Sequence, residues 1–284
     1  MIKTLKQFIS PFRKIVYKNL KGRPWSYGYN DTRWELINNT IRNEAHLNQF
    51  AQNLIPNQYA IGFDERLVEY PWLFSRLIKL KGQQVLDAGS TFNFPSLVSH
   101  PAVQQNHFTI YTFYPEQESF NKQRISYVYG DLRSLPFKDN HFDCVVCQST
   151  IEHIDMDNSI YGYELASNKE VTQKSYEYEK VVHEIVRVLK SNGKLLLTFP
   201  YGKFENHGFF QQFDAEMLER ITNYLYQYGQ PSTHYFKYTP QGWIASTASD
   251  CNDCESYNPH TGKGIGNDGA AHSRAIACIE FVKK

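Results

Sequence analysis

The sequence lacks several features that define broad protein classes. It contains no apolar run close to the roughly 20 residues that a membrane-spanning helix needs. Residues 1–23 scatter apolar side chains among Lys and Arg, so they lack the continuous apolar centre of a secretory signal peptide. The chain has only five cysteines, an odd number. Without an export signal, we expect these thiols to be reduced and the protein to be cytoplasmic.

An excess of charge of one sign is also missing. The 30 basic and 29 acidic residues leave a formal net charge of +1, which argues against nucleic acid as a partner. Basic residues gather only in residues 1–23, which contain no acid. This arm is either a solvated or packed basic face or a weak contact with an anionic membrane surface. The apolar fraction of 41% is sufficient for one sizeable core.

Residues 1–80 are predicted to form a mostly helical extension. Thr32 and Glu35 have the spacing of a helix capping box, and a later helix is expected to end at Leu80, before a glycine. The segment has few long apolar runs, so we do not expect it to be an independent domain. Residues 81–284 are the predicted main domain.

The main domain alternates strands with helices. This order predicts an α/β fold, a Rossmann-like, mostly parallel sheet of seven strands with helices on both faces. The last strand is expected to be antiparallel, because residues 244–274 before it look like a long Gly-rich loop or lid. Helices are predicted over 175–190, ended by Gly193, and over 215–228, capped by Asp214. Strands are predicted at 84–88, 108–113, 125–129, 142–147, 194–199, 234–238 and 275–282.

Polar residues follow three of these strands at the point where each strand ends. Asp87 and Gly89 follow the first strand, Gly130 and Asp131 follow the third, and residues 148–153 follow the fourth. Ligands of open α/β sheets bind beyond the carboxyl ends of the strands. The glycine after the first strand also permits a tight turn close to a ligand. We therefore expect one small-molecule pocket at this edge of the sheet.

Four segments in this order resemble the class I S-adenosylmethionine-dependent methyltransferase family, of the methyltransferase type 11 kind. They are VLDAGS (85–90), GDLRSLPFKDNHFDCVV (130–146), CQSTIEHI (147–154) and HEIVRVLKSNGKLLLTFPYG (183–202). The loop at residues 22–25 and the variant turn after the first strand also resemble, more loosely, methyltransferase-like proteins that accompany bacterial surface-polysaccharide functions. The resemblance implies S-adenosyl-L-methionine as the cofactor.

The resemblance also assigns roles to residues at the strand ends. Asp87, Gly89 and Ser90 would hold the methionine and ribose side of the cofactor, and Asn93 would stand in for a family glycine. The adenine amino group would meet Asp131, and its ring the amide of Leu132. Gln148 and Ser149 would line the methionine end.

The sequence departs from the family at two places. The family turn continues with two further glycines, where this chain has Thr91 and Asn93. Asn tolerates a positive φ better than most residues, but Thr91 has no such explanation. The family also ends its second strand with an acid that binds the ribose hydroxyls. Here Glu116 is the nearest acid, several residues late, so ribose recognition is unexplained.

Three residues near the fourth strand are candidates for a catalytic base. His153, Glu152 and Asp155 follow that strand, and each either accepts a proton from the acceptor or only shapes the pocket. His207 and His234 are lesser candidates, on later segments that could face the acceptor.

The cysteines suggest no complete metal site. Cys144 and Cys147 lie within one strand at a spacing that directs their side chains to opposite faces. Cys251 and Cys254 have only His260 and His272 as distant partners, which is an incomplete zinc pattern. We therefore expect no metal.

Three functions are compatible with these patterns. The first is methyl transfer to a polar acceptor, a hydroxyl of a sugar, a glycan or a small natural product. The second is a methyltransferase-like binding or scaffold protein without activity. The third, a nicotinamide-dependent oxidoreductase, lacks the glycine spacing and the ribose-binding acid of that class.

Overall fold

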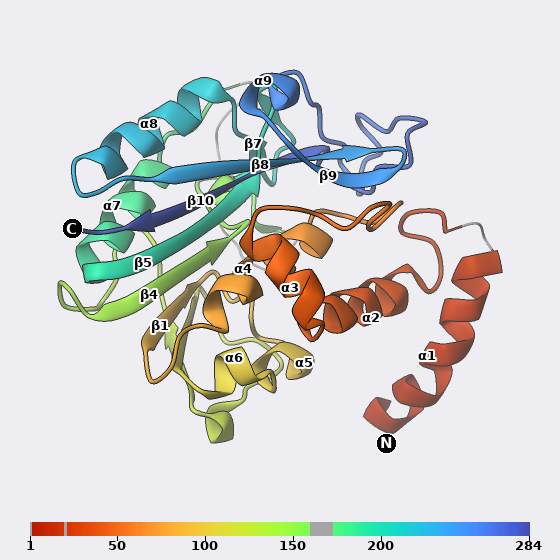
Figure 1. Cartoon of the computed structure of the whole chain (residues 1–284), viewed down its shortest axis with the longest axis horizontal. Helices are drawn as coiled ribbons and strands as arrows, with labels where there is room; N and C mark the ends of the chain where they lie inside the picture. Colours follow the sequence, from red (N-terminus) through yellow and green to blue (C-terminus); the bar gives the residue numbers. More distant parts are fainter. Residues whose placement is uncertain (1, 20–21, 160–172) are drawn as a thin grey trace.

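A computed structural model describes residues 2–19, 22–159 and 173–284, and the side chains from residue 10 onward within those ranges. Its centre is an eight-stranded sheet in the order β3-β2-β1-β4-β5-β10-β8-β9 (Figure 1). The strands are β1 (Gln84–Ala88), β2 (His107–Thr112), β3 (Ile125–Tyr129), β4 (Phe142–Gln148), β5 (Leu189–Pro200), β8 (Ser232–Thr239), β9 (Gly242–Ser246) and β10 (Ala275–Val282). A separate pair consists of β6 (Glu205–Asn206) and β7 (Gln211–Gln212).

The strand directions confirm the predicted Rossmann-like sheet. Strands β1 to β5 pair in parallel, and β10 is antiparallel to both β5 and β8. The predicted number of seven strands is wrong by one, because β9 pairs antiparallel with β8. This extra strand forms where a turn at Gly242, with φ of 104°, folds the chain back on itself. Its Trp243 is buried, and its residues 244–246 fall within the predicted 244–274 loop and are less buried.

Helices cover both faces of the sheet, as predicted. One buried cluster joins the sheet to the amino-terminal helices α2 (Tyr29–Ile41), α3 (Glu44–Ala51) and α4 (Arg66–Leu77). The other joins it to α7 (Tyr178–Val188) and α8 (Ala215–Tyr226). Figure 1 shows the two sets on opposite sides. Cys144 belongs to the first cluster and Cys147 to the second, which confirms that these two thiols point to opposite faces.

The remaining elements are short, apart from the first helix. They are α1 (Ile2–Asn19), α5 (Pro95–Val98), α6 (Pro101–Gln104), η1 (Asn121–Gln123), η2 (Ile151–His153) and α9 (Ala248–Cys251). No helix among the described residues is long and apolar enough to span a bilayer. The first half of the basic arm has side chains outside the described residues. Its second half packs on α2, where Lys14 Nζ lies 2.9 Å from Glu35 Oε1.

Several local predictions can be compared with the helix ends. Asp214 caps α8 as predicted, since its side chain accepts a hydrogen bond from Met217 N. The capping box at Thr32 is wrong, because α2 begins at Tyr29 and the Thr32 hydroxyl donates to the Gly28 carbonyl. The Gly193 cap is also wrong. Asn192 takes the left-handed conformation there, with φ of 61°.

Candidate functional site

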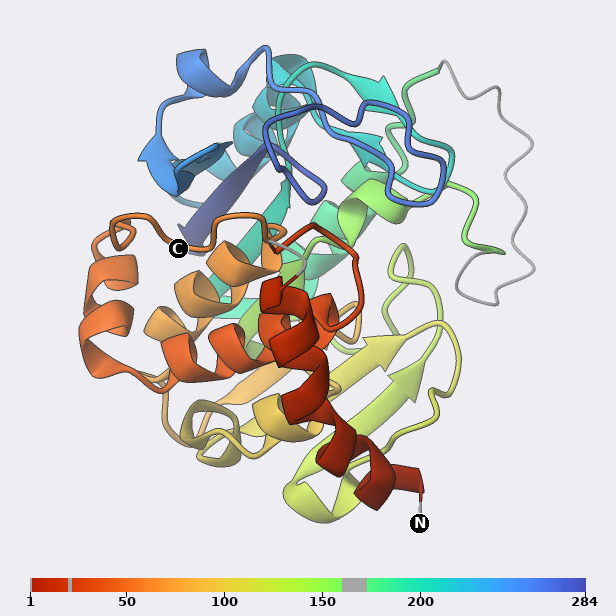
Figure 2. The ribbon, with the colours of Figure 1, turned by 90° about the vertical axis from the view of Figure 1, so that its right-hand side faces the viewer.

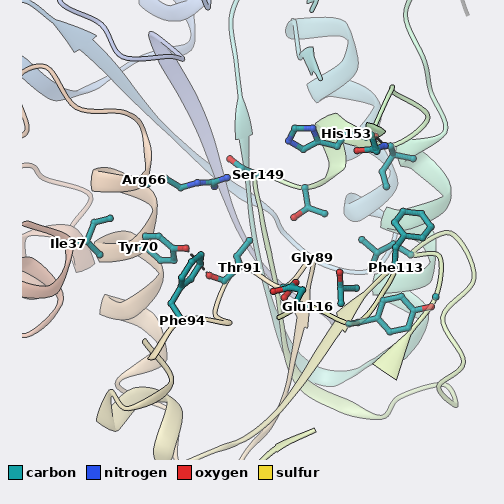
Figure 3. Close-up of a pocket in the computed structure, with 18 of the residues that line it drawn as sticks. Ile37, Arg66, Tyr70, Gly89, Thr91, Phe94, Phe113, Glu116, Ser149 and His153 are labelled. Atoms are coloured by element: carbon teal, nitrogen blue, oxygen red, sulfur yellow. Dashed lines mark hydrogen bonds between the residues drawn. The ribbon is translucent and has the colours of Figure 1, made fainter. Parts of the chain in front are cut away.

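A cavity of about 380 Å³ lies beyond the carboxyl ends of β1, β2, β3 and β4 (Figure 3). This size suits a small organic ligand. The strand ends supply one wall, and helices α2 and α4 supply the other. We call this space the large cavity. Its lining includes Arg33, Trp34, Ile37, Arg66, Tyr70, Gly89, Ser90, Thr91, Phe94, Glu116, Gly130, Leu132, Ser149, Thr150, His153, Ile154 and Asn158.

The floor of the large cavity requires a glycine at position 89. Gly89 has φ of 126°, and a Cβ added there would lie 2.1 Å from Thr150 Oγ1. The Thr150 hydroxyl is itself fixed by donating to the Gln148 carbonyl. The loops after β1 and β4 therefore touch through this glycine. Beside it, Ser90 Oγ is buried and has no hydrogen-bond partner among the described residues, which leaves it for a ligand.

Asp87 holds the turn after β1 by hydrogen bonds to residues of that turn. Its Oδ1 accepts from the amide and the hydroxyl of Thr91, and its Oδ2 accepts from Phe92 N at 2.8 Å. The side chain is fully buried and is not part of the cavity lining. Burial raises the pKa of Asp87 to about 6. Thr91 thus has a function that its sequence position did not reveal: its hydroxyl helps to hold this carboxyl group.

Asn93 fixes Glu116 at the cavity. Asn93 Nδ2 donates to Glu116 Oε2 at 2.8 Å and to the Glu118 carbonyl at 3.0 Å. Its Oδ1 accepts from the Tyr127 hydroxyl at 2.8 Å. Figure 3 shows Glu116 beside Gly89 and Thr91. The two departures from the family pattern therefore meet in space: the residue in place of a glycine holds the acid that comes late.

The loop after β3 supplies the next part of the lining. Gly130 and Leu132 line the cavity, whereas the Asp131 side chain does not. Its carboxylate accepts from the Arg133 amide and guanidinium, with the closest contact at 2.6 Å. Burial alone would raise the pKa of Asp131, but these hydrogen bonds lower it. Any contact between Asp131 and a ligand must share this carboxylate with Arg133.

Glu69 of α4 links the amino-terminal helices to β4 and β5. This carboxylate is completely buried. Its Oε1 accepts from the hydroxyls of Ser149 and Thr198 at 2.5 and 2.6 Å. Its Oε2 accepts from Arg66 Nη1 at 2.7 Å and Gln148 Nε2 at 3.1 Å. The predicted pair Gln148 and Ser149 is therefore held from α4, and of the two only Ser149 lines the cavity.

The three predicted base candidates have different surroundings. His153 lines the cavity, and its Nδ1 lies 2.7 Å from the Phe209 carbonyl; burial lowers its pKa to about 4. Glu152 is buried, Oε2 has no partner among the described residues, and burial raises its pKa well above the usual value. Asp155 accepts from the Ser175 hydroxyl at 2.6 Å and does not line the cavity.

A second, smaller pocket of about 170 Å³ adjoins the large cavity, since both are lined by Arg33, Arg66 and His153. We call it the small pocket. Residues from both ends of the chain form it: Trp25, Asp64 and Glu65 from the amino-terminal part, Glu152, Phe209 and Phe210 from the middle, and Pro259, His260 and His272 from the last loop. The predicted loop thus contributes to the site.

The other histidines and the cysteines do not complete a metal site. Across residues 2–19, 22–159 and 173–284, no group of three or more His, Cys, Asp or Glu side chains is placed to hold an ion. Cys251 and Cys254 are buried free thiols. His207 is buried outside both pockets, and His234 lies on β8, with its Nε2 3.2 Å from the Ser232 hydroxyl.

The amino-terminal contributors to the site were missed in the sequence. Arg33, Glu65, Arg66 and Glu69 all lie in residues 1–80, which were predicted only as an extension. One signal was present. The helix Arg66–Leu77 is apolar apart from Glu69 and a few polar residues, and a charged side chain on a buried helix needs a partner.

Comparisons with known proteins found similarity to methyltransferases. Residues 111–197 match a family described as a methyltransferase domain. No curated protein matches the chain. A solved structure of 1,6-didemethyltoxoflavin-N1-methyltransferase from Burkholderia thailandensis, with bound S-adenosylhomocysteine, is 13% identical, with 72% of each chain covered and a TM-score of 0.42. An S-adenosylmethionine-dependent methyltransferase from Methanosarcina mazei is 11% identical, with 73% of this chain and 96% of that chain covered and a TM-score of 0.42.

Proposed function

We propose that this chain, of which residues 111–197 match a methyltransferase-domain family, methylates a polar acceptor with S-adenosyl-L-methionine as the cofactor. The acceptor class that we favour is a hydroxyl of a sugar, a glycan or a small natural product. The large cavity would hold S-adenosyl-L-methionine, and the small pocket would hold the acceptor. The observation that carries this proposal is the meeting of Gly89, Leu132, Ser149 and Glu116 around one cavity.

The residues around the large cavity suit the successive parts of this cofactor. Leu132 offers an apolar surface and a backbone amide to the adenine ring, with Asp131 nearby. Glu116, held by Asn93, would accept hydrogen bonds from the ribose hydroxyls. Ser90 Oγ, which is buried without a partner among the described residues, would donate to the cofactor.

The methionine end of the cofactor would lie toward α4. Its carboxylate would approach Arg66, which lines the cavity and keeps only part of its guanidinium on Glu69. A guanidinium is the side chain best suited to pair with a carboxylate. Ser149, held by Glu69, would line the same end. When bound, the cofactor supplies a methyl group made electrophilic by the sulfonium.

The small pocket supports a polar, hydroxylated acceptor. Its walls combine the aromatic rings of Trp25, Phe209 and Phe210 with carboxylate and imidazole groups. The Trp25 ring is fixed, since its Nε1 donates to the Ala271 carbonyl at 2.6 Å. A sugar can make both kinds of contact. Its C–H face packs on an aromatic ring, and its hydroxyls form hydrogen bonds with charged side chains.

Calorimetry with S-adenosylmethionine and S-adenosylhomocysteine tests the proposal. We expect both to bind, and methyl transfer to a panel of glycosides and phenolic natural products to follow. The alternative, a binding or scaffold protein without activity, was motivated by the missing turn glycines. The bonds of Thr91 and Asn93 show how the turn is held without them. Absence of heat at millimolar cofactor would overturn the enzyme proposal in favour of this alternative.

A further inference from the structure

The small pocket contains a glutamate–histidine pair that the cofactor site does not use. Glu65 precedes α4, and His272 lies in the loop before β10. We propose that His272 is the general base that removes the proton from the acceptor hydroxyl, with Glu65 as the residue that orients its ring. This inference rests on the proposed function, because a general base is needed only if the acceptor is a neutral hydroxyl.

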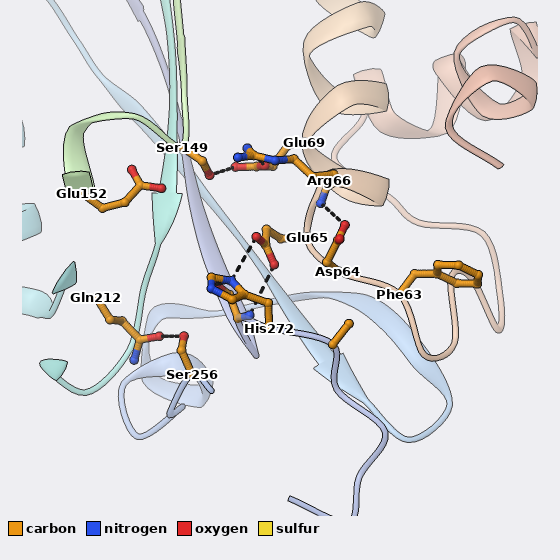
Figure 4. A network of polar contacts seen from close by, with 12 residues as sticks. Phe63, Asp64, Glu65, Arg66, Glu69, Ser149, Glu152, Gln212, Ser256 and His272 are labelled. Carbon is orange, nitrogen blue, oxygen red and sulfur yellow. Dashed lines mark hydrogen bonds and ion pairs between the residues drawn. The ribbon is translucent and has the colours of Figure 1, made fainter. Parts of the chain in front are cut away.

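His272 Nδ1 lies near the Glu65 carboxylate and also 3.0 Å from the hydroxyl of its neighbour Ser273. His272 Nδ1 lies 3.2 Å from Glu65 Oε1 (Figure 4). The other oxygen, Oε2, accepts from the backbone amide of Ser273 at 3.3 Å, so the carboxylate holds the loop at two adjacent residues. A carboxylate that accepts from Nδ1–H leaves the lone pair of a neutral imidazole on Nε2. The His272 ring also packs on Phe210, with the ring centres 4.9 Å apart.

The surroundings favour a base of useful strength at this position. The Glu65 and His272 side chains are 8% and 14% exposed. Burial alone would lower the pKa of His272, but the Glu65 carboxylate raises it above the ordinary value. The titratable groups that act on His272 are Glu65, Asp64, Arg66 and His153. Two of these are already paired, since Asp64 binds Arg33 at 2.6 Å and Arg66 binds Glu69 at 2.7 Å. Glu65 is therefore the nearest partner available to an imidazolium.

The residues predicted as bases are less suited to this task. A pKa of about 4 makes His153 a weak proton acceptor. Burial raises the pKa of Glu152 well above its usual value, and its carboxyl group lies at the wall of the small pocket. Asp155 bonds Ser175 and lies outside both pocket linings. We infer that His153 and Glu152 shape the acceptor pocket and that His272 accepts the proton.

The proposed step balances in atoms and charge. The acceptor O–H bond breaks, and its proton passes to His272 Nε2. The oxygen forms a bond to the methyl carbon while the carbon–sulfur bond breaks, and that electron pair stays on sulfur. The cofactor thereby loses its positive charge, and the imidazole gains one next to Glu65. The products are a methyl ether, S-adenosylhomocysteine and an imidazolium that returns its proton to solvent.

The position of His272 near the reacting sulfur can be tested directly. S-adenosylmethionine carries one more positive charge, on its sulfur, than S-adenosylhomocysteine, and a nearby positive charge lowers the pKa of a histidine. We would titrate the histidine side chains of the full chain by NMR with each bound. The His272 resonance is assigned by its loss in His272→Gln. We expect its pKa to be lower with S-adenosylmethionine by roughly 0.3 to 1.2, the range for charges about 10 Å apart. Glu65→Gln should lower the His272 pKa by about 1 or more, which identifies the same ring if His272→Gln does not fold.

A matched control is available at the opposite edge of the sheet. His107 is exposed at the start of β2, at the far end of that strand from the site, so His107→Gln should remove a different resonance and change neither value. Calorimetry on the same samples separates two failures. If neither compound binds, the proposed function is wrong. If both bind and the His272 pKa is the same with each, or if Glu65→Gln leaves it unchanged, the assignment of His272 alone is overturned.

Discussion

Replacement of Glu116 by Gln tests how the ribose is recognised. In the structure one oxygen of this carboxylate accepts from Asn93 Nδ2 at 2.8 Å, and the side chain is exposed toward the cavity that it lines. A hydrogen bond to a charged group contributes about 1.5–3 kcal/mol. Solvent exposure reduces this contribution, so we expect a loss of about 1–2 kcal/mol in binding. That loss corresponds to a roughly 5- to 30-fold higher Kd for S-adenosylmethionine.

Calorimetry of S-adenosylhomocysteine and its 2′,3′-dideoxy analogue locates the effect. The unsubstituted protein should bind S-adenosylhomocysteine more tightly than the dideoxy analogue by about the same factor. The Glu116→Gln variant should lose this preference. Glu219→Gln is a matched control, because Glu219 is an exposed residue of α8 away from both pockets. A variant that keeps the full preference for the ribose compound would refute the role of Glu116.

The hydrogen bond from Asn93 to Glu116 predicts that Asn93 also affects cofactor binding. Asn93→Ala should also weaken cofactor binding, because Glu116 loses its positioning partner. If the two residues act as one unit, the double variant should bind more tightly than the sum of the single losses predicts, by about 0.5 kcal/mol or more. Asn93 also accepts from Tyr127, so the melting temperature of each variant must be measured alongside. Fully additive losses would mean that Asn93 acts only on stability.

The remaining predictions concern the other parts of the site. Gly89→Ala should abolish cofactor binding in calorimetry, because its Cβ would lie 2.1 Å from Thr150 Oγ1; measurable binding would refute the close approach. Asp131→Ala should raise the cofactor Kd by a factor that corresponds to about 1–2 kcal/mol, and unchanged affinity would refute the adenine assignment. The pKa of His272 is raised on folding, so its stabilisation is complete below about pH 6.5 and is lost as pH rises through the folded pKa; chemical denaturation should show the difference from His272→Gln shrinking over that range. Shortening residues 259–267 should reduce methyl transfer and leave the cofactor Kd within about twofold, whereas equal losses would argue against an acceptor-side loop.

The strand pattern made most of the sheet predictable from the sequence. Short apolar runs ended by glycine or polar residues located β1, β3 and β10 to the residue. The extra strand β9 was missed because its burial depends on contacts far away in sequence. The amide of Trp243 donates to the Tyr59 carbonyl, and its indole to the Phe63 carbonyl. No local pattern in a Gly-rich stretch reports such partners.

Site residues were predictable from the sequence only where they directly follow a strand and need no partner from a distant segment. Gly89, Ser90, Leu132, Ser149 and His153 were expected at a pocket and line the large cavity. Glu65 and His272 are 207 positions apart in the chain and meet only in the folded structure, so neither could be recognised from its neighbours. The Asn93–Glu116 contact was missed for a similar reason, since the two residues were noticed as separate departures.

One buried carboxyl group, Glu69, joins the amino-terminal helices to the ends of β4 and β5. Glu69 is fully buried and satisfied by Arg66 on one side and by Ser149 and Thr198 on the other. Removal of residues 1–80 would remove this carboxylate and leave both hydroxyls without their acceptor, while it uncovers a face of the sheet. The family match covers residues 111–197, which contain just over half of the residues that line the large cavity. We therefore expect the choice of acceptor to be determined mainly outside that span, by Trp25, Arg33 and the Glu65–His272 pair.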